Sequence, residues 1–84
     1  MKDLTSSDYN NGKAPPCTFI VGEKYTVIWN GKTYDNLVCY RSSDHNVIAS
    51  SDNGCPFYID NDGGSGLYIE SDGDSWTVTI CQGE

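Results

Sequence analysis

The sequence predicts an all-β domain: a small antiparallel β-sandwich, immunoglobulin-like or barrel-like, with about seven short strands and essentially no helix. From residue 17 onward apolar and polar residues alternate, which is the pattern of half-buried strands. Turn-forming clusters of Gly, Asn, Asp and Ser recur about every ten residues, a spacing typical of sandwiches and barrels. No stretch of helical length combines a capping residue with apolar residues three or four positions apart.

The chain has the length of one small domain. Its 84 residues are 37% hydrophobic, which suits one core and leaves no room for a second. Residues 1–16 are polar and end in Ala14-Pro15-Pro16, so we expect a loosely held N-terminal arm that could include one edge strand. Residues 17–84 are expected to form the single β-sandwich domain.

The first three predicted strands include a strong hairpin signal. Residues 17–21 alternate, with Phe19 and Val21 on one face, and residues 24–29 follow after a turn. Asn30-Gly31 comes next and favours a two-residue type I′ turn, because both of its positions need positive φ. We expect the third strand to cover residues 32–41. The predicted register pairs Trp29 with Lys32, Val27 with Tyr34, and Tyr25 with Asn36.

Four further strands are expected at residues 45–49, 55–60, 67–70 and 76–81, each bounded by turn residues. The apolar phase of the strands predicts a single core. Its members are Phe19, Tyr25, Val27, Trp29, Tyr34, Phe57, Ile59, Leu67, Ile69, Val78 and Ile80.

The charge excludes two classes of partner. Twelve acidic residues against five basic ones give a net charge of −7. A nucleic-acid-binding protein needs a basic face, and so does a protein that binds anionic membranes. No apolar run has the length of a transmembrane helix. The first ten residues carry Asp3 and Asp8 and lack an apolar centre, so we expect no signal peptide and synthesis in the cytoplasm.

Cys17, Cys39, Cys55 and Cys81 leave three alternatives open. Free and mostly buried thiols are favoured, because structural disulfides are rare in a reducing compartment. One or two disulfides are the second alternative, with three possible connectivities for two of them. A zinc site is the third, although the long gaps between these cysteines lack the short spacing of such sites.

Neither catalysis nor a cofactor is expected from the polar residues. His45 is the only histidine, and Ser42 and Asp44 are merely its sequence neighbours, which does not make a catalytic triad. Residues 60–66 are rich in oxygen ligands, but they do not follow the spacing of an EF-hand calcium loop. We therefore expect an ordinary turn and no metal. The weak candidate ligands are Asp60, Asp62, Asp72 and Asp74.

The tyrosines give the candidate binding residues. Tyr58 and Tyr68 alternate with apolar neighbours, so both are expected to point outward beside Asp60 and Glu70, with Tyr40 nearby. Outward tyrosines beside carboxylates suit a protein surface or a sugar ring. The alternative interpretation is cross-strand aromatic pairing that only stabilises the sheet.

A longer pattern resembles small all-β modules encoded by phages and prophages of gut Firmicutes. Residues 21–34, VGEKYTVIWNGKTY, resemble the opening hairpin of those modules. Later segments match their remaining strands in order. These are Gly54-Cys55-Pro56-Phe57, Leu67-Tyr68-Ile69 and Thr77-Val78-Thr79-Ile80.

The resemblance implies a non-catalytic binding or structural module, associated with the virion or its tail, whose partner is a phage structural protein, a host protein or a surface glycan. The acidity has two further interpretations. It either keeps a β-rich domain soluble, or it belongs to a small acidic phage inhibitor of a host defence protein that mimics the charge of nucleic acid.

Overall fold

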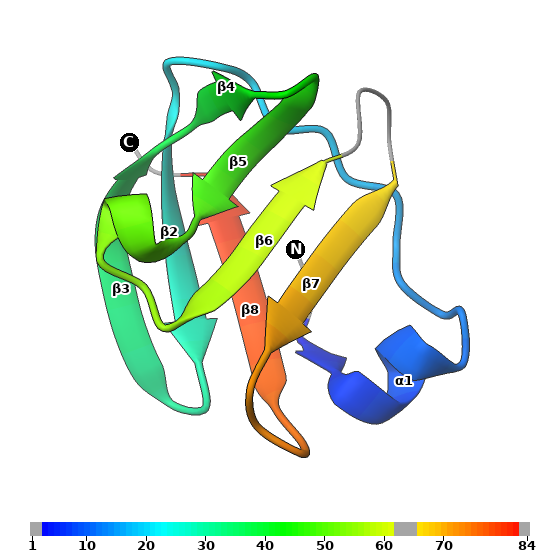
Figure 1. Ribbon diagram of the computed structural model, residues 1–84. Helices are drawn as coiled ribbons and strands as arrows, with labels where there is room; N and C mark the ends of the chain where they lie inside the picture. The colour runs from blue at the N-terminus through cyan, green and yellow to red at the C-terminus, as the bar shows by residue number, and fades with distance from the viewer. Residues whose placement is uncertain (1–2, 62–65, 83–84) are drawn as a thin grey trace.

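Two four-stranded antiparallel sheets pack face to face in the computed structural model, which describes residues 3–61 and 66–82 (Figure 1). The first sheet has the order β1-β8-β2-β3, formed by β1 (Leu4–Thr5), β8 (Thr77–Gln82), β2 (Lys24–Trp29) and β3 (Lys32–Val38). The second has the order β4-β5-β6-β7, formed by β4 (Tyr40–Ser42), β5 (His45–Ala49), β6 (Phe57–Asn61) and β7 (Leu67–Ser71). The predicted antiparallel sandwich is confirmed. The helical segments are one turn of α-helix, α1 (Ser6–Asn10), and the 3₁₀ turn η1 (Ser51–Asn53).

The β2–β3 hairpin forms where its turn residues predict it. Asn30 and Gly31 have φ values of 49° and 85°, as a type I′ turn requires. Next to the turn the predicted register is confirmed, because Trp29 pairs with Lys32 and Val27 with Tyr34.

Further along this hairpin the predicted register is wrong by one residue. The pairing is irregular between Tyr25 and Val27, and Asn36 on the partner strand has a positive φ of 60°. Tyr25 therefore opposes Leu37, and Leu37 becomes a buried core residue. A bulge of this kind adds one residue to one strand and reverses which residues face inward beyond it.

The predicted continuous strand at residues 32–41 is in fact two strands in different sheets. Strand β3 ends at Val38, and Cys39 carries the chain across to β4 (Figure 1). The crossing is fixed by the backbone: the Cys39 N–H donates to the Glu23 carbonyl, and the Gly22 N–H donates to the Cys39 carbonyl, each at 2.9 Å. Cys39 is buried between the sheets.

Residues 17–21 form no strand, contrary to the sequence prediction. Asparagine side chains replace the missing strand neighbours, since the Asn46 amide donates to the Phe19 carbonyl at 2.8 Å and the Asn61 amide donates to the Cys17 carbonyl. Phe19 is buried as predicted, but Val21 does not share its face and is exposed.

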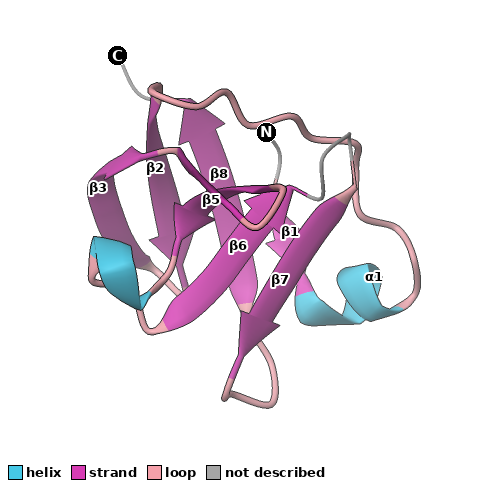
Figure 2. Ribbon diagram, turned by 45° about the horizontal axis from the view of Figure 1, so that its top comes forward, coloured by secondary structure: helices cyan, strands magenta, loops and turns pink. Residues whose placement is uncertain are grey.

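The N-terminal arm is part of the sandwich, which corrects both its loose attachment and the domain boundary at residue 17. Leu4 pairs with Val78, and its side chain lies in the core. The Ser6 N–H donates to the Trp76 carbonyl at 2.9 Å, and the Ser6 hydroxyl accepts from the Trp76 N–H at 3.1 Å. The Tyr9 hydroxyl accepts from the Ile69 N–H at 3.1 Å, so α1 lies beside β7 (Figure 2). The arm thus connects the two sheets.

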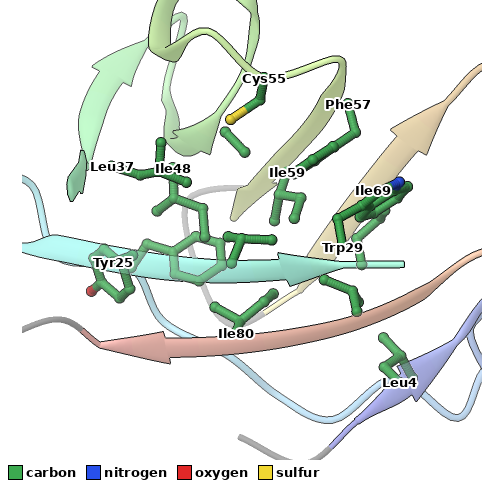
Figure 3. Close-up of a cluster of buried hydrophobic side chains, with 14 of the residues drawn as sticks. Leu4, Tyr25, Trp29, Leu37, Ile48, Cys55, Phe57, Ile59, Ile69 and Ile80 are labelled. Atoms are coloured by element: carbon green, nitrogen blue, oxygen red, sulfur yellow. The ribbon is translucent and has the colours of Figure 1, made fainter. Parts of the chain in front are cut away.

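The core lies between the sheets, as Figure 3 shows. Trp29 stacks on Phe57 with ring centroids 4.2 Å apart and on Trp76 at 5.1 Å. Of the predicted core, Tyr34 and Leu67 are only half-buried, and all the others are buried. The structure adds core residues that the strand pattern did not predict. These are Leu4, Leu37, Cys39, Ile48, Ala49, Cys55 and Trp76.

Candidate binding face on the second sheet

The outer face of the second sheet carries the predicted binding residues. The register aligns Tyr40 with Val47, Val47 with Asp60, and Asp60 with Tyr68 in one row across all four strands. Directly opposed residues of antiparallel strands project to the same side. Ile59 and Ile69, the alternate residues of β6 and β7, point into the core.

A short repeat builds the centre of this face. Strand β6 contains Tyr58-Ile59-Asp60 and β7 contains Tyr68-Ile69-Glu70. Because the strands are antiparallel, Tyr58 lies opposite Glu70, and Asp60 lies opposite Tyr68. We call these four residues, Tyr58, Asp60, Tyr68 and Glu70, the tyrosine–carboxylate array.

Each tyrosine of the array donates a hydrogen bond to the carboxylate of its own strand. Tyr58 Oη lies 2.8 Å from Asp60 Oδ2, and Tyr68 Oη lies 2.8 Å from Glu70 Oε2. The two rings meet edge to face, with centroids 6.0 Å apart and an interplanar angle of 71°. The array therefore presents ring faces and oxygen acceptors, because both phenolic protons are already used.

Burial differs sharply within the array. Asp60 is 2% exposed, whereas Tyr68 is 43% exposed and Glu70 is also exposed. His45 Nδ1, on the adjacent strand β5, lies 3.0 Å from Asp60 Oδ2. Asp60 Oδ1 is buried and has no hydrogen-bond partner in the part of the chain that the structure describes. Asp60, one of the predicted binding residues, is therefore the buried member of the array and not an accessible one.

The carboxylates keep these phenols protonated. Burial raises the pKa of Tyr58, and the hydrogen bond to Asp60 and the charge of that group raise it further. The hydrogen bond to Glu70 is the main cause of the raised pKa of Tyr68, followed by the Glu70 charge. In both cases ionisation would place two negative charges side by side.

A shallow groove of about 480 Å³ lies beside the array. Tyr58 and Glu70 of the array line it together with Tyr40 and Asp52. The Tyr40 hydroxyl lies in hydrogen-bond contact with Ser50 and donates to Asp52 Oδ2 at 3.1 Å, so Tyr40 is held toward η1. Burial raises the pKa of Tyr40, with the Asp52 carboxylate adding to the effect.

Of the polar trio, Ser42 and His45 are register partners on β4 and β5, whereas Asp44 contacts Arg41. Asp44 Oδ1 lies 3.3 Å from Arg41 Nη2, and the carboxylate beside His45 is that of Asp60 instead. The sequence could not indicate this partner, because fifteen positions separate the two residues along the chain.

The weak metal candidates do not converge. Asp62 lies outside the described residues. Asp60 lies near the end of the β6–β7 pair at which Asn61 pairs with Leu67. Asp72 and Asp74 follow the opposite end, at which Phe57 pairs with Ser71. Within residues 3–61 and 66–82, no three carboxylate, cysteine or histidine side chains are grouped as metal ligands would be.

The four cysteines are free thiols, which was the favoured alternative. Cys39 and Cys55 are buried, Cys17 is half-buried and Cys81 is exposed. Desolvation raises the pKa of the Cys17, Cys39 and Cys55 thiols, which makes them poor nucleophiles.

The structure brings together Tyr58, Asp60, Tyr68 and Glu70, as the sequence predicted, and Tyr40 lines the same groove as Tyr58 and Glu70. Sequence analysis missed His45 and Asp52 as parts of this face. His45 shares the face of Val47, two residues later, but the register was needed to show that this face of β5 points outward, and Asp52 lies in a turn that alternation cannot orient.

Comparison with known proteins adds no relative: no family model, curated protein or solved structure matches the chain. None of the helices in the described part of the chain is both long and apolar enough to cross a membrane.

Proposed function

We propose that this chain is a non-catalytic binding module that recognises a macromolecular partner with the outer face of its second sheet. The observation that carries this proposal is the tyrosine–carboxylate array, in which two neighbouring strands present a matched pair of hydrogen-bonded tyrosines beside an open groove. Tyr68 exposes 43% of its surface there, and large exposed tyrosines are typical anchors of protein interfaces.

The proposed setting is the one that the resemblance to phage modules implies: a virion- or tail-associated protein. A second candidate, a small acidic inhibitor of a host defence protein, is favoured by the charge of this same region. Between residues 40 and 72 the chain has one basic residue, Arg41. Its acidic residues there are Asp44, Asp52, Asp60, Asp62, Glu70 and Asp72.

A pair of matched surface substitutions tests the binding face. Tyr68 is 43% exposed on the second sheet, and Val38 is 44% exposed on the first. Immobilised wild-type chain, Tyr68→Ala and Val38→Ala would each be used to capture partners from cells in which the gene occurs. We expect Val38→Ala to retain the wild-type partner and Tyr68→Ala to lose it. Equal retention by both variants would refute the proposed face.

The setting is tested separately with an antibody against the chain. Detection in purified phage particles supports the virion role. Detection only in the soluble fraction of infected cells, with a captured host protein, supports the inhibitor. If the gene occurs in no phage or prophage genome, both settings are refuted. The binding face is then tested by the two surface substitutions alone.

A further inference from the structure

The array lacks the donors that most polar ligands need. All three tyrosines of the face donate to carboxylates of the chain itself, Tyr58 to Asp60, Tyr68 to Glu70 and Tyr40 to Asp52. What remains for a ligand is a set of lone pairs on carboxylate and phenol oxygens, together with the faces of the rings. A sugar hydroxyl both donates and accepts, so this surface would satisfy only half of its hydrogen-bonding capacity.

Positive charge is scarce on this face. Arg41 is the one lysine or arginine between residues 40 and 72, and its guanidinium already lies 3.3 Å from Asp44. His45 is the other group here that can become cationic, and its Nδ1 faces Asp60. The charge around the groove is therefore dominated by the carboxylates of Asp52, Glu70 and Asp72.

Asp60 gives a second and independent indication of a cationic ligand. Its carboxylate is 2% exposed, and its Oδ1 has no hydrogen-bond partner among the described residues. Burying a carboxylate with an unused acceptor lowers the stability of a fold. Its register partner on β7 is the exposed Tyr68, so this buried charge belongs to the array and lies beside the strand position of the exposed ring. Water screens a buried charge poorly, and it therefore acts strongly on a cation seated on the rings.

We propose that the array binds an arginine side chain of a partner protein, with the adjoining groove receiving the neighbouring residues of that arginine-bearing segment. A guanidinium stacks on the exposed Tyr68 ring and donates to the Glu70 carboxylate at its edge. Arginine is favoured over lysine because its planar group can stack and donate two parallel hydrogen bonds at once. This inference rests on the proposed binding function and specifies the chemistry of its partner.

The test uses the full chain and a defined peptide. Backbone amide NMR shifts of ¹⁵N-labelled protein would be followed during titration with acetyl-Gly-Arg-Gly-Arg-Gly-amide at low salt. The comparison peptide has citrulline in place of both arginines, which keeps the shape and removes the charge. We expect shift changes in β6, β7 and the groove, and binding at least about tenfold weaker for the citrulline peptide. Equal affinity for both peptides would overturn the proposal.

Two carboxylate variants separate a specific site from general attraction to an acidic protein. Glu70→Gln removes the array carboxylate. Asp35→Asn removes an exposed carboxylate of β3 that likewise accepts from a hydroxyl, that of Thr26 at 3.3 Å. Both variants change the net charge by the same amount. We expect Glu70→Gln to weaken arginine-peptide binding by about fivefold or more and Asp35→Asn to leave it within about twofold. Equal losses would show attraction to net charge only and overturn the proposal.

The outcomes also distinguish this inference from the proposed function. Maltotriose serves as a sugar probe in the same titration. If maltotriose shifts the array residues and the arginine peptide does not, the inference is wrong while the binding face stands. The same conclusion holds if Tyr68→Ala abolishes partner capture and the peptide does not bind. If capture is independent of Tyr68 and the peptide does not bind, both are wrong.

Discussion

The two tyrosines of the array allow a comparison of two similar hydrogen bonds that differ chiefly in burial. Tyr58 and Tyr68 each donate to a carboxylate two residues later, and both bonds measure 2.8 Å. Asp60 is 2% exposed, however, whereas Glu70 is exposed. Replacing either tyrosine by phenylalanine removes one hydroxyl and keeps the ring. The difference between Tyr58→Phe and Tyr68→Phe therefore measures what burial adds to the same hydrogen bond.

The expected magnitudes differ severalfold. Tyr58→Phe leaves a buried carboxylate short of a donor, and a hydrogen bond to a charged group contributes about 1.5–3 kcal/mol to the free energy of unfolding. Tyr68→Phe lets water replace the phenol at Glu70, so its effect should stay within about 0.5 kcal/mol. A domain of this length is stable by roughly 4–13 kcal/mol, so the first change is large against the total.

Urea unfolding followed by tryptophan fluorescence measures both values, because Trp29 and Trp76 lose their buried environment on unfolding. An Asp60→Asn background supplies the internal control. There Tyr58→Phe removes only a neutral hydrogen bond, and its cost should fall to about 0.5–1.5 kcal/mol. If Tyr58→Phe and Tyr68→Phe destabilise the protein equally, or if the Asp60→Asn background changes nothing, burial does not strengthen this bond and the reasoning is refuted.

Three other predictions follow from the same structure. Because the pKa of Tyr58 is raised in the folded state, the native chain holds a proton that the unfolded chain releases above about pH 10. The stability that the Tyr58 proton contributes is therefore fully present below that pH and is lost as the pH rises above it. In thermal melts the melting temperature should fall less steeply with alkaline pH for Tyr58→Phe than for the wild type. Identical dependence of the melting temperature on pH in the two proteins would contradict this. Under native conditions a thiol reagent should label Cys81 rapidly, and it should label Cys39 and Cys55 only at the rate of unfolding. Mass spectrometry of timed samples measures these labelling rates. Rapid labelling of all three thiols would mean that the core is open to solvent. Trp29→Ala removes a ring stacked on two aromatic partners, and it should cost about 3–5 kcal/mol in urea unfolding; a loss below about 1 kcal/mol would remove this residue from the centre of the core.

Local signals predicted the parts of the fold that local chemistry determines. Asn30-Gly31 determined both the turn and the register next to it, because positive φ at two successive positions selects one hairpin geometry. Alternation then placed most core residues correctly. The bulge at Asn36 broke that inference: one inserted residue moved Leu37 to the inner face, and an alternating pattern gives no warning of such a shift.

The errors that remain come from contacts between distant parts of the chain. The polar composition of residues 1–16 predicts a loosely held arm. The hydrogen bond between Ser6 and Trp76, seventy positions apart in the sequence, holds this segment against the sandwich. The same holds for Asn61, which the sequence placed in a loop. It is 1% exposed, and its amide donates to the carbonyl groups of Cys17 and Gly66. A buried amide that replaces a strand neighbour has no signature in the sequence, because asparagine is also one of the residue types that dominate turns.

The candidate site shows the same division between local and distant information. Tyr58-Ile59-Asp60 and Tyr68-Ile69-Glu70 are nearly identical as sequence and were predicted to behave alike. The sheet order separates them. Strand β6 is interior, so Asp60 has Val47 on one side and Tyr68 on the other, with His45 close by. Strand β7 is at the edge of the sheet, so Glu70 has a strand neighbour only at Tyr58.

Because β6 is interior and β7 is at the edge, the two carboxylates can contribute to binding in different ways. Asp60 is enclosed by its neighbours, and its charge is fixed in place and screened little by water. Glu70 reaches solvent at the edge, where an incoming group can contact it without displacing a protein side chain. The same three-residue pattern occurs once inside the sheet and once at its edge. It thus supplies both the buried negative charge of Asp60 and the accessible carboxylate of Glu70. It follows that Asp60→Asn should weaken arginine-peptide binding even though a bound guanidinium need not touch Asp60. Unchanged affinity in that variant would show that Glu70 and the rings act alone.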